Sequence, residues 1–390
     1  MINPEICMGA AACVRACPEK KALVVVNGAG HLADAAGCIG HGACKSACPV
    51  SAIELVFGTA RRGVDLPEFS PSFETSSAGV YIAGELGGMG LVANAVRQGV
   101  RAVTAVADDL QKKRSGSEDA VDLLVVGAGP AGLAATLMAK ERGLSCRTLE
   151  REASLGGSVL AYPRGKIVMT TPVTLPLYGK VRLRRVTKEA LIELWRDVVK
   201  VTGIEFEFDV LVTGAKRVDD VFEVQTSRGE LRARRVLLAT GRRGKPRTLG
   251  VDGEELSHVH SQLVDAALHD GEACLIVGGG DSAVEAARAL AERPGTRITL
   301  SYRQSAFGRV KPENREAIEQ LASDGRVRLM LGSQVQSITQ QTARLKDAEG
   351  EHVVDADRVF VLIGRELPNK LLAGFGVELR TYRGEAPGFV

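Results

Sequence analysis

Short, fully apolar runs recur along this chain, and most of them are followed by a turn and then by apolar residues at helical spacing. Residues 121–150 read as one strand, turn, helix and strand, and residues 274–301 repeat that order. Residues 79–84 predict another buried strand, and residues 91–106 place small and apolar side chains at the spacing of a helix. Strands alternating with helices predict an α/β fold with parallel sheets.

The turn of the first unit carries the glycine pattern of a dinucleotide-binding site. Gly127, Gly129 and Gly132 form G-x-G-x-x-G: the first glycine makes the bend, the second lets backbone approach a pyrophosphate, and the third lets helix pack on strand. The helix N-terminus faces the phosphates, and Glu150 is placed to bind a ribose. A glycine-rich packing turn is the simpler alternative, but strand, helix and acid all stand at the expected spacing. The residues predicted to contact this nucleotide are Gly127, Gly129, Pro130, Ala131, Gly132 and Glu150.

The second unit carries a related turn, G-G-G-D-S-A, at residues 278–283. Its next strand ends without an acid; Arg303 follows, with Arg309 and Lys311 nearby. Cations at this point suit a 2′-phosphate, so the sequence favours NADPH over NADH, although the arginines could simply be solvated. The residues predicted to contact this second nucleotide are Gly278, Gly280, Asp281, Ser282 and Arg303.

Cysteine is concentrated at the N-terminus. Six of the eight cysteines lie within residues 1–57, in two copies of C-x5-C-x3-C-P that are offset by 31 positions. A run of β-forming residues follows each Cys-Pro pair, at residues 22–26 and 52–57. This repeat predicts a small, pseudo-symmetric domain made by duplication.

Composition and charge narrow the class of protein. The 390 residues are 45% hydrophobic, which fits an ordinary soluble globular protein of two or three domains. Lys and Arg (50) nearly balance Asp and Glu (47), which argues against nucleic-acid binding, although the arginines at 182–185 and 232–235 could meet an acidic partner if they are not merely solvated. No apolar run is long enough to span a membrane, and no signal peptide is recognisable. We therefore expect a cytoplasmic protein whose cysteines serve metal or redox chemistry.

The cysteine repeat resembles a bacterial two-cluster ferredoxin, in which each half reads C-x2-C-x2-C-x3-C-P and the fourth cysteine binds the cluster of the other half. Ala10 and His41 stand where the second cysteine of each motif is expected. Alanine cannot bind iron, so the resemblance implies a [3Fe-4S] cluster, or a [4Fe-4S] cluster with one open iron, at the first site; His41 is either a ligand or a surface residue. A scaffold without metal is the alternative. The implied thiolate ligands are Cys7, Cys13 and Cys48 for the first cluster, and Cys38, Cys44 and Cys17 for the second.

Residues 73–106 resemble the last FAD-contacting segment of the thioredoxin-reductase-like flavoproteins, whose pattern T-S-x-x-G-V-[FY]-x-A-G-D precedes a helix. The resemblance implies that Gly84 and Glu85, the latter in place of the usual Asp, contact FAD. Residues 155–158, including Gly157, resemble the family's turn near the isoalloxazine ring, and the Ala-Thr-Gly at 239–241 resembles its strand end.

The order of these segments departs from that family. The segment at 73–106 normally follows the second nucleotide site, and residues 359–378 resemble the stretch that normally precedes it. We therefore expect a circular permutation, with residues 108–118 as the linker between the old termini. The expected architecture is two Rossmann-like domains plus a small α+β ferredoxin-like domain. The expected divisions are 1–57 for iron-sulfur, 58–120 for the permuted FAD segment and linker, 121–241 for FAD, 242–358 for NAD(P)H and 359–390 for the return to the FAD domain.

The electron acceptor is indicated by what is missing. Thioredoxin reductases carry a C-x-x-C in the nucleotide domain, and a related thiol-disulfide reductase group has a cysteine where Ala131 stands. This sequence has neither the C-x-x-C pair nor that cysteine. Its two remaining cysteines, Cys146 and Cys274, lie in predicted buried strands. The resemblance thus implies an iron-sulfur flavoprotein oxidoreductase that exchanges electrons between NAD(P)H and clusters through FAD, with a protein or small-molecule partner, no catalytic nucleophile and a homodimer as one option. The alternatives are a non-catalytic redox sensor and a flavin-dependent reductase or dehydrogenase of an organic substrate, which an apolar pocket over the flavin beside residues 160–180 would favour. Residues 166–180, rich in Pro, Thr and Gly, are expected to form a loop over a ligand.

Overall fold

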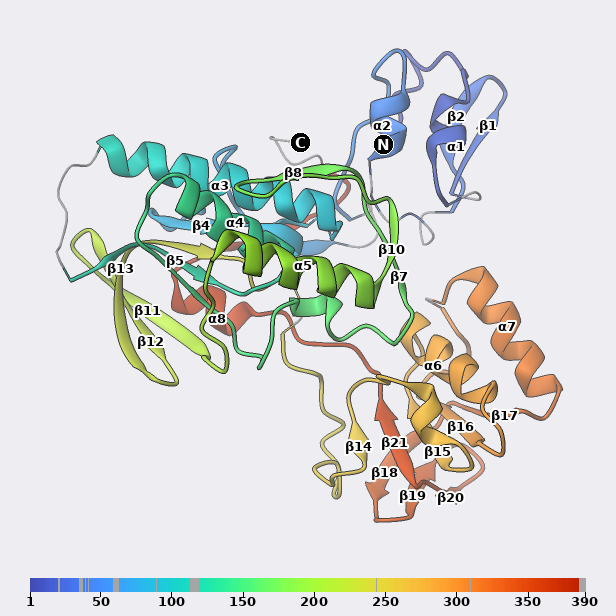
Figure 1. Ribbon diagram of the computed structural model, residues 1–390. Helices are drawn as coiled ribbons and strands as arrows, with labels where there is room; N and C mark the ends of the chain where they lie inside the picture. Colours follow the sequence, from blue (N-terminus) through green and yellow to red (C-terminus); the bar gives the residue numbers. More distant parts are fainter. Residues whose placement is uncertain are drawn as a thin grey trace. The chain divides into compact units, whose positions relative to one another are not determined.

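The computed structural model of the chain divides into two compact units (Figure 1). Unit 1 comprises Met1–Arg243 and Pro368–Val390, and unit 2 comprises Gly244–Leu367. The residues that the structure describes are 1–19, 22–34, 38, 40, 42–58, 63–88, 90–112, 119–242, 244–308 and 310–385. Within these residues, no helix is both long enough and apolar enough to cross a membrane.

The N-terminal region repeats its backbone conformation as well as its sequence. The short helices α1 (Ala12–Ala16) and α2 (Ala43–Ala47) stand 31 positions apart, as the cysteines do. Each follows a residue in the left-handed conformation, Ala11 before α1 and Gly42 before α2. The backbone therefore carries the duplication that the sequence predicts.

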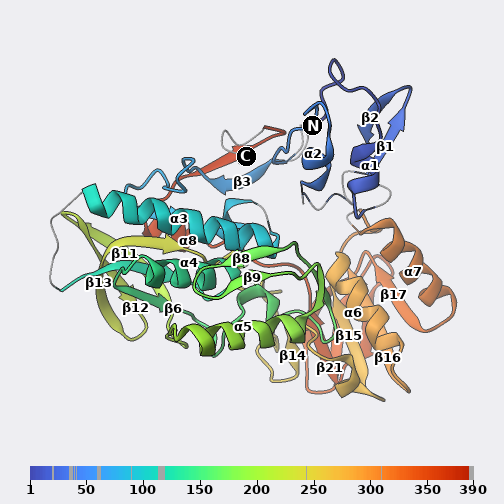
Figure 2. The same cartoon turned by 45° about the horizontal axis from the view of Figure 1, so that its top comes forward.

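Two pairings hold this region together. Strands β1 (Leu23–Val26) and β2 (Ala29–Leu32) form an antiparallel hairpin, which lies with α1 and α2 in Figure 2. Ile2 bridges Ile53. The expected β-run at 52–57 forms only isolated bridges, because Phe57 pairs with Glu385, near the other end of the chain, rather than with a neighbouring strand.

The main sheet of unit 1 has the order β11-β12-β13-β5-β6, and β4 adds to it by pairing with β13. Strands β4, β5 and β6 run parallel to β13, whereas β11 and β12 form antiparallel pairs at the other side. The bounds are β4 (Val80–Ile82), β5 (Val121–Val126), β6 (Cys146–Leu149), β11 (Val212–Val218), β12 (Val221–Thr226) and β13 (Gly229–Leu238). The first strand predicted within residues 121–150 is thus β5, an interior strand of the sheet that is buried from Leu123 to Val126.

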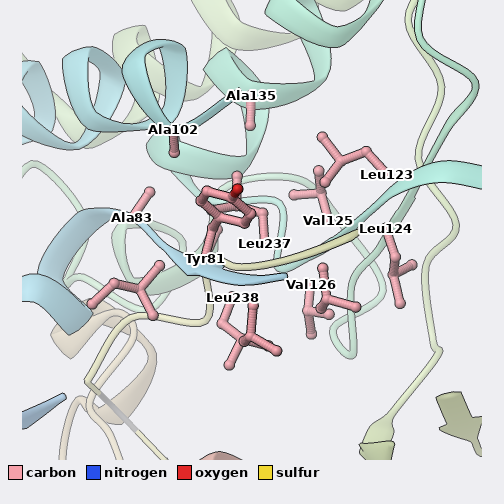
Figure 3. Close-up of a cluster of buried hydrophobic side chains, with 14 of the residues drawn as sticks. Tyr81, Ala83, Ala102, Leu123, Leu124, Val125, Val126, Ala135, Leu237 and Leu238 are labelled. Carbon is pink, nitrogen blue, oxygen red and sulfur yellow. The ribbon is translucent and has the colours of Figure 1, made fainter. Parts of the chain in front are cut away.

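The core of unit 1 lies between this sheet and its helices. In Figure 3, Tyr81 of β4 points toward Ala102 and Ala135, which belong to α3 (Val92–Lys112) and α4 (Pro130–Glu141). Leu124 and Val126 point to the opposite face, as the two-residue period of a strand requires. Both faces of β5 are buried, which explains why its sequence is a continuous apolar run.

The segment that precedes the first glycine turn in sequence is built into this sheet. Val80 of β4 pairs with Val236 of β13, directly beside the pairing of Leu124 with Val236 on the other side. Helix α3 packs on α4 so closely that a Cβ at Gly99 would lie 2.3 Å from the carbonyl oxygen of Ala131. The two helices therefore meet backbone to backbone.

The expected linker at 108–118 was partly wrong. Helix α3 continues to Lys112, and residues 113–118 lie outside the described part of the chain. The helix continues because Asp109 binds the guanidinium of Arg235 at 2.6 Å and Leu110 is buried. Arg235 is almost fully buried, so a polar-looking stretch of sequence is in fact anchored to β13.

Residues 166–180, expected to form a loop, contain short strands. β7 (Ile167–Met169) pairs with β10 (Arg185–Thr187), and β8 (Val173–Leu175) pairs with β9 (Gly179–Val181). Helix α5 (Lys188–Thr202) follows, capped by the hydroxyl of its preceding threonine. The β-branched residues of these strands explain the difference, because they favour extended pairs over a structureless loop.

The C-terminal return closes unit 1. After α8 (Asn369–Gly374), strand β22 (Leu379–Tyr382) pairs antiparallel with β3 (Val64–Pro67). Tyr382 pairs with Val64, so the end of the described chain lies beside the start of the segment that carries β4. The phenyl ring of Phe57 stacks edge-on against Tyr382, at 5.8 Å between ring centroids.

Unit 2 is a second parallel α/β domain, with strand order β14-β21-β15-β16-β17. The expected boundaries of 242–358 differ from those of the unit, because β21 pairs with β15 inside it and the chain returns to unit 1 only at Pro368. A three-stranded antiparallel sheet, β18-β19-β20, completes the unit. The bounds are β14 (Val259–His260), β15 (Ala273–Val277), α6 (Asp281–Ala291), β16 (Arg297–Tyr302), α7 (Pro312–Ser323), β17 (Val327–Leu331), β18 (Gln334–Ile338), β19 (Thr342–Lys346), β20 (Glu351–Asp355) and β21 (Arg358–Val361).

Candidate functional sites

The first glycine turn joins β5 to α4, and each of its three glycines meets a different constraint. Gly127 has φ 109°, which favours glycine. A Cβ at Gly132 would lie 1.8 Å from the carbonyl oxygen of Gly127, so any side chain there would separate helix from strand. At Gly129, by contrast, a Cβ would meet nothing closer than 3.9 Å. The protein's own packing therefore does not require glycine at 129, and the open space above it fits a bound phosphate group.

Glu150, at the end of β6, closes one side of this turn. It is buried, and one carboxylate oxygen accepts the N–H of Ala128 at 2.7 Å while the other accepts the N–H of Glu152 at 3.0 Å. Each carboxylate oxygen can accept more than one hydrogen bond, so capacity for ribose hydroxyls remains. The same carboxylate thus shapes the turn and stands where the sequence predicts the ribose.

Two further predicted segments lie against this turn. A Cβ at Gly157, which begins the 3-10 turn Gly157–Val159, would approach the Cα of Gly129 to 3.0 Å. From the other segment, a Cβ at Gly84 would lie 3.1 Å from the Cβ of Ala131. Pro130, the first residue of α4, lies between Gly129 and Ala131 in the sequence. Gly84 and Gly157 are therefore both brought to the glycine turn.

Glu85 belongs to the 3-10 turn Gly84–Gly87, which follows β4 directly. Its side chain is half-buried. The N–H of Gly84 is held by the amide oxygen of Gln98 at 2.8 Å, which fixes this turn against α3. Gln98 was not predicted from the sequence, because a polar residue on a helix gives no sign that it caps a distant turn.

The glycine turn of unit 2 has the same construction. Gly278 has φ 150°, and a Cβ there would lie 2.4 Å from the carbonyl oxygen of Leu362. The ring of Tyr302 covers Gly279, where a Cβ would approach it to 2.2 Å. Gly280 again faces open space, with nothing within 4 Å of a Cβ, so this turn also leaves room for a phosphate at the N-terminus of α6.

The side chains at the start of α6 organise the loop that carries the cations. One oxygen of Asp281 accepts the N–H of Lys311 at 2.9 Å and the side-chain amide of Asn314 at 2.7 Å. Ser282 and Arg303 are exposed. Arg309 lies outside the described residues. The predicted residues of the second nucleotide site thus share the end of the sheet at which β15 and β16 terminate.

Three cysteines of the first predicted cluster line one pocket in the N-terminal region. Cys7, Cys13 and Cys48 all lie in the wall of this pocket, and Ala10 lines it as well. The N–H of Gly30 donates to the Sγ of Cys7 at 3.3 Å, and the N–H of Ala52 donates to the Sγ of Cys48 at 3.2 Å. Backbone N–H groups of Gly30, the largest cause, and Gly9 lower the pKa of the Cys7 thiol and so favour a thiolate ligand.

The thiols of the second predicted set also influence one another. Burial raises the pKa of Cys17 and Cys44, and the charge of Cys38 adds to both shifts. His41 lies outside the described residues. Among the described side chains, no three Cys, His, Asp or Glu residues are arranged to hold a single metal ion. A polynuclear cluster differs from a single ion in that each thiolate binds its own iron, so the ligands stand apart.

The two remaining cysteines, Cys146 and Cys274, pack in the cores of the two units. Cys274 is buried in β15 and Cys146 is half-buried in β6, and the two strands belong to different units. Burial raises the pKa of each thiol to about 12. At neutral pH both are protonated and poorly nucleophilic.

Taken together, two dinucleotide-binding α/β folds and an N-terminal cysteine domain define a two-nucleotide oxidoreductase with an attached iron-sulfur module. Residues 124–385, more than half of the chain, match the family described as pyridine nucleotide-disulphide oxidoreductase. The chain belongs to this family. Residues 1–49 match the 4Fe-4S dicluster domain. The protein is therefore an FAD- and NAD(P)H-dependent oxidoreductase that carries an iron-sulfur domain.

Two curated relatives and two solved structures illustrate the similarity. The chain is 26% identical over 263 residues to bacilliredoxin reductase Bdr of Bacillus subtilis (strain 168), covering 66% of this chain and 80% of that protein. It is 29% identical over 267 residues to a ferredoxin--NADP reductase of Ignicoccus hospitalis, covering 66% and 82%. In fold it is similar to bacillithiol disulfide reductase Bdr (YpdA) from Staphylococcus aureus, with TM-score 0.57, 22% identity and coverage of 67% and 81%. Thioredoxin reductase of Lactococcus lactis gives TM-score 0.50, 21% identity and coverage of 66% and 81%.

Proposed function

We propose that this protein exchanges electrons between NAD(P)H and its own iron-sulfur domain through a bound FAD. The observation that carries the proposal is the pocket shared by Cys7, Cys13 and Cys48 in a chain whose two cysteines outside the N-terminal region, Cys146 and Cys274, are separate core residues. A dithiol reductase would need paired cysteines and would have no use for that pocket. Bound FAD can take electrons from NAD(P)H in pairs and release them singly.

The residues of this chain bind and orient the two nucleotides. We assign FAD to Gly127, Gly129, Pro130, Ala131, Gly132, Glu150, Gly157, Gly84 and Glu85, and NAD(P)H to Gly278, Gly280, Asp281, Ser282 and Arg303. The open space at Gly129 and Gly280 supports the two phosphate positions. Arg303, exposed after β16, supports a preference for the 2′-phosphate of NADPH.

We assign the first cluster to Cys7, Cys13 and Cys48, and the second to Cys17, Cys38 and Cys44, with His41 as a further candidate ligand. The methyl group of Ala10 lines the first pocket, at the position where a fourth ligand is expected. This supports a three-iron cluster, or a four-iron cluster with one exchangeable iron, at the first site.

We further propose that the FAD domain is circularly permuted. Two observations support this: β4 and α3 are built into the domain although they precede it in sequence, and β22 pairs with β3. The family match begins at residue 124, after the segment that contains β4. A chain whose old termini were joined by the segment between α3 and β5, and which was cut between β22 and β3, would have this arrangement.

The partner is inferred as a redox protein. Several curated relatives are named ferredoxin--NADP reductase, which supports an iron-sulfur or similar one-electron carrier as donor or acceptor. The intramolecular iron-sulfur domain supplies a route for single electrons between FAD and that carrier. A homodimer stays a prediction.

Anaerobic EPR with iron and sulfide counts, before and after addition of NADPH, tests the proposed function. We expect bound FAD, at least three irons at the first site, and cluster signals that change once NADPH is added. A three-iron centre gives a signal in the oxidised protein, which separates it from a four-iron one. NADPH that bleaches the flavin but never changes the cluster spectrum would refute the proposal.

A further inference from the structure

One segment of unit 1 is strongly basic, although the chain as a whole is not. Residues 160–188, here called the basic lobe, contain no Asp or Glu. Because the whole chain carries only +3, the rest of it is net negative. The cations of the lobe are Arg164, Lys166, Lys180, Arg182, Arg184, Arg185 and Lys188. All of them except Lys188 are exposed, so the lobe concentrates positive potential on one part of the surface.

The lobe has defined structure. It consists of the strand pairs β7 with β10 and β8 with β9. The hydroxyl of Tyr178 donates to Asp197 of α5 at 2.7 Å, and the guanidinium of Arg97 donates to Thr171 and to the carbonyl of Pro172, both at 3.3 Å. The segment is therefore fixed to α3 and α5, and its cations are presented on a shaped surface rather than on a loose loop.

Apolar side chains are exposed among these cations. Ile167 is 44% exposed, and Leu177, at the turn between β8 and β9, is 46% exposed. Leu177 also has φ 60°, in the left-handed region that disfavours side chains with a Cβ. Exposed apolar side chains with a polar and charged surround are the arrangement found at protein-protein interfaces, and strained backbone is concentrated at functional sites.

The position of the lobe connects it to the flavin site. It begins directly after the turn Gly157–Val159, whose glycine lies against Gly129. A protein bound to the lobe would therefore contact the stretch of chain that directly follows this turn. Nucleic acid or an anionic membrane would satisfy the charge, but neither would have a use for a basic segment that is continuous in the chain with the proposed flavin site.

We propose that the basic lobe docks an acidic, one-electron carrier protein, an inference that rests on the proposed function. In one turnover, NADPH is oxidised to NADP⁺ and H⁺ while two carrier molecules each gain one electron, and the reverse reaction balances in the same way. The cations steer the carrier to the lobe, and Ile167 and Leu177 supply the apolar contact.

The test uses the holoprotein with Arg182→Glu and Arg184→Glu together, and three acceptors: a small acidic [2Fe-2S] ferredoxin, a basic c-type cytochrome, and menadione, which is uncharged. The matched control is Arg297→Glu with Arg344→Glu, because both arginines are exposed, lie in unit 2 and change the net charge equally. At low ionic strength we expect the lobe variant to lose about tenfold or more in the second-order rate of ferredoxin reduction. Added salt should shrink that difference. The control variant should behave like the wild type.

The outcomes separate the two proposals. If the wild type does not oxidise NADPH with any of the three acceptors, the proposed function fails. If the wild type reduces all three, and the lobe variant reduces ferredoxin as fast as the wild type at low salt, the docking surface is refuted. It would also be refuted if the lobe variant lost cytochrome or menadione reduction to the same extent as ferredoxin reduction. A lobe variant that still reduced ferredoxin normally but no longer bound tRNA or anionic phospholipid vesicles would refute it too. Leu177→Ser should weaken ferredoxin reduction without changing its salt dependence.

Discussion

Replacing Gly99 by alanine tests whether the segment that carries α3 is an integral part of the FAD domain. Two effects of opposite sign compete. In the middle of a helix, Gly→Ala ordinarily stabilises by about 1 kcal/mol. Here the new Cβ would lie 2.3 Å from the carbonyl oxygen of Ala131 and 3.2 Å from the N atom of Ala135, so α3 has to move by about 1 Å to reach ordinary contact. Overpacking of this kind costs about 1–3 kcal/mol, and the opposing atoms are backbone, which cannot rotate away.

We therefore expect Gly99→Ala to lower the stability of unit 1 by about 1–2 kcal/mol, and its midpoint of thermal unfolding by about 2–8 °C. Because Ala131 belongs to the glycine turn, the variant should also release FAD more readily. Thermal unfolding followed by flavin fluorescence measures both. Gly308→Ala is the control, because its φ is not positive and a Cβ there meets nothing within 4 Å. An unchanged or raised midpoint for Gly99→Ala, with normal FAD retention, would mean that α3 does not pack on the FAD domain as described.

Three further substitutions test the assigned sites. Glu150→Gln removes the charge that accepts the N–H groups of Ala128 and Glu152, so FAD affinity should fall by about 10- to 100-fold in equilibrium dialysis, whereas unchanged affinity would remove Glu150 from the site. Arg303→Gln should lower kcat/KM for NADPH by about tenfold and leave that for NADH nearly unchanged; equal losses would argue against 2′-phosphate recognition. Ala10→Cys should give a first cluster with four firmly held irons and no three-iron EPR signal, even after mild oxidation, and a three-iron signal that persists would exclude Ala10 from the ligand position.

The sequence predicted most of the elements that position the sites. The first strand expected within residues 121–150 and the helix expected within residues 274–301 correspond to β5 and α6, since their apolar periods are clear and a glycine turn marks where each ends or begins. The glycine turns were recognisable because three glycines at fixed spacing meet three different steric demands. At Gly129 and Gly280 that demand is not internal packing, because a Cβ would fit at both positions; glycine there leaves room for a phosphate.

Long-range contacts were less predictable. Arg235 looked like part of an exposed arginine cluster, yet it is buried because Asp109, more than 100 positions earlier, reaches it from α3. The end of α3 was misjudged for the same reason. Gln98 and Tyr302 support the glycine turns through contacts that appear only when the chain is folded, and no local pattern marks them.

The central claim is that electrons pass between NADPH and the clusters by way of FAD. It is tested most directly by anaerobic EPR of two preparations, one complete and one from which FAD has been removed, each mixed with NADPH under the same conditions. The account predicts reduced-cluster signals in the complete protein, none in the FAD-free protein, and recovery of the signals once FAD is restored. Clusters that reduce equally well without FAD would contradict it.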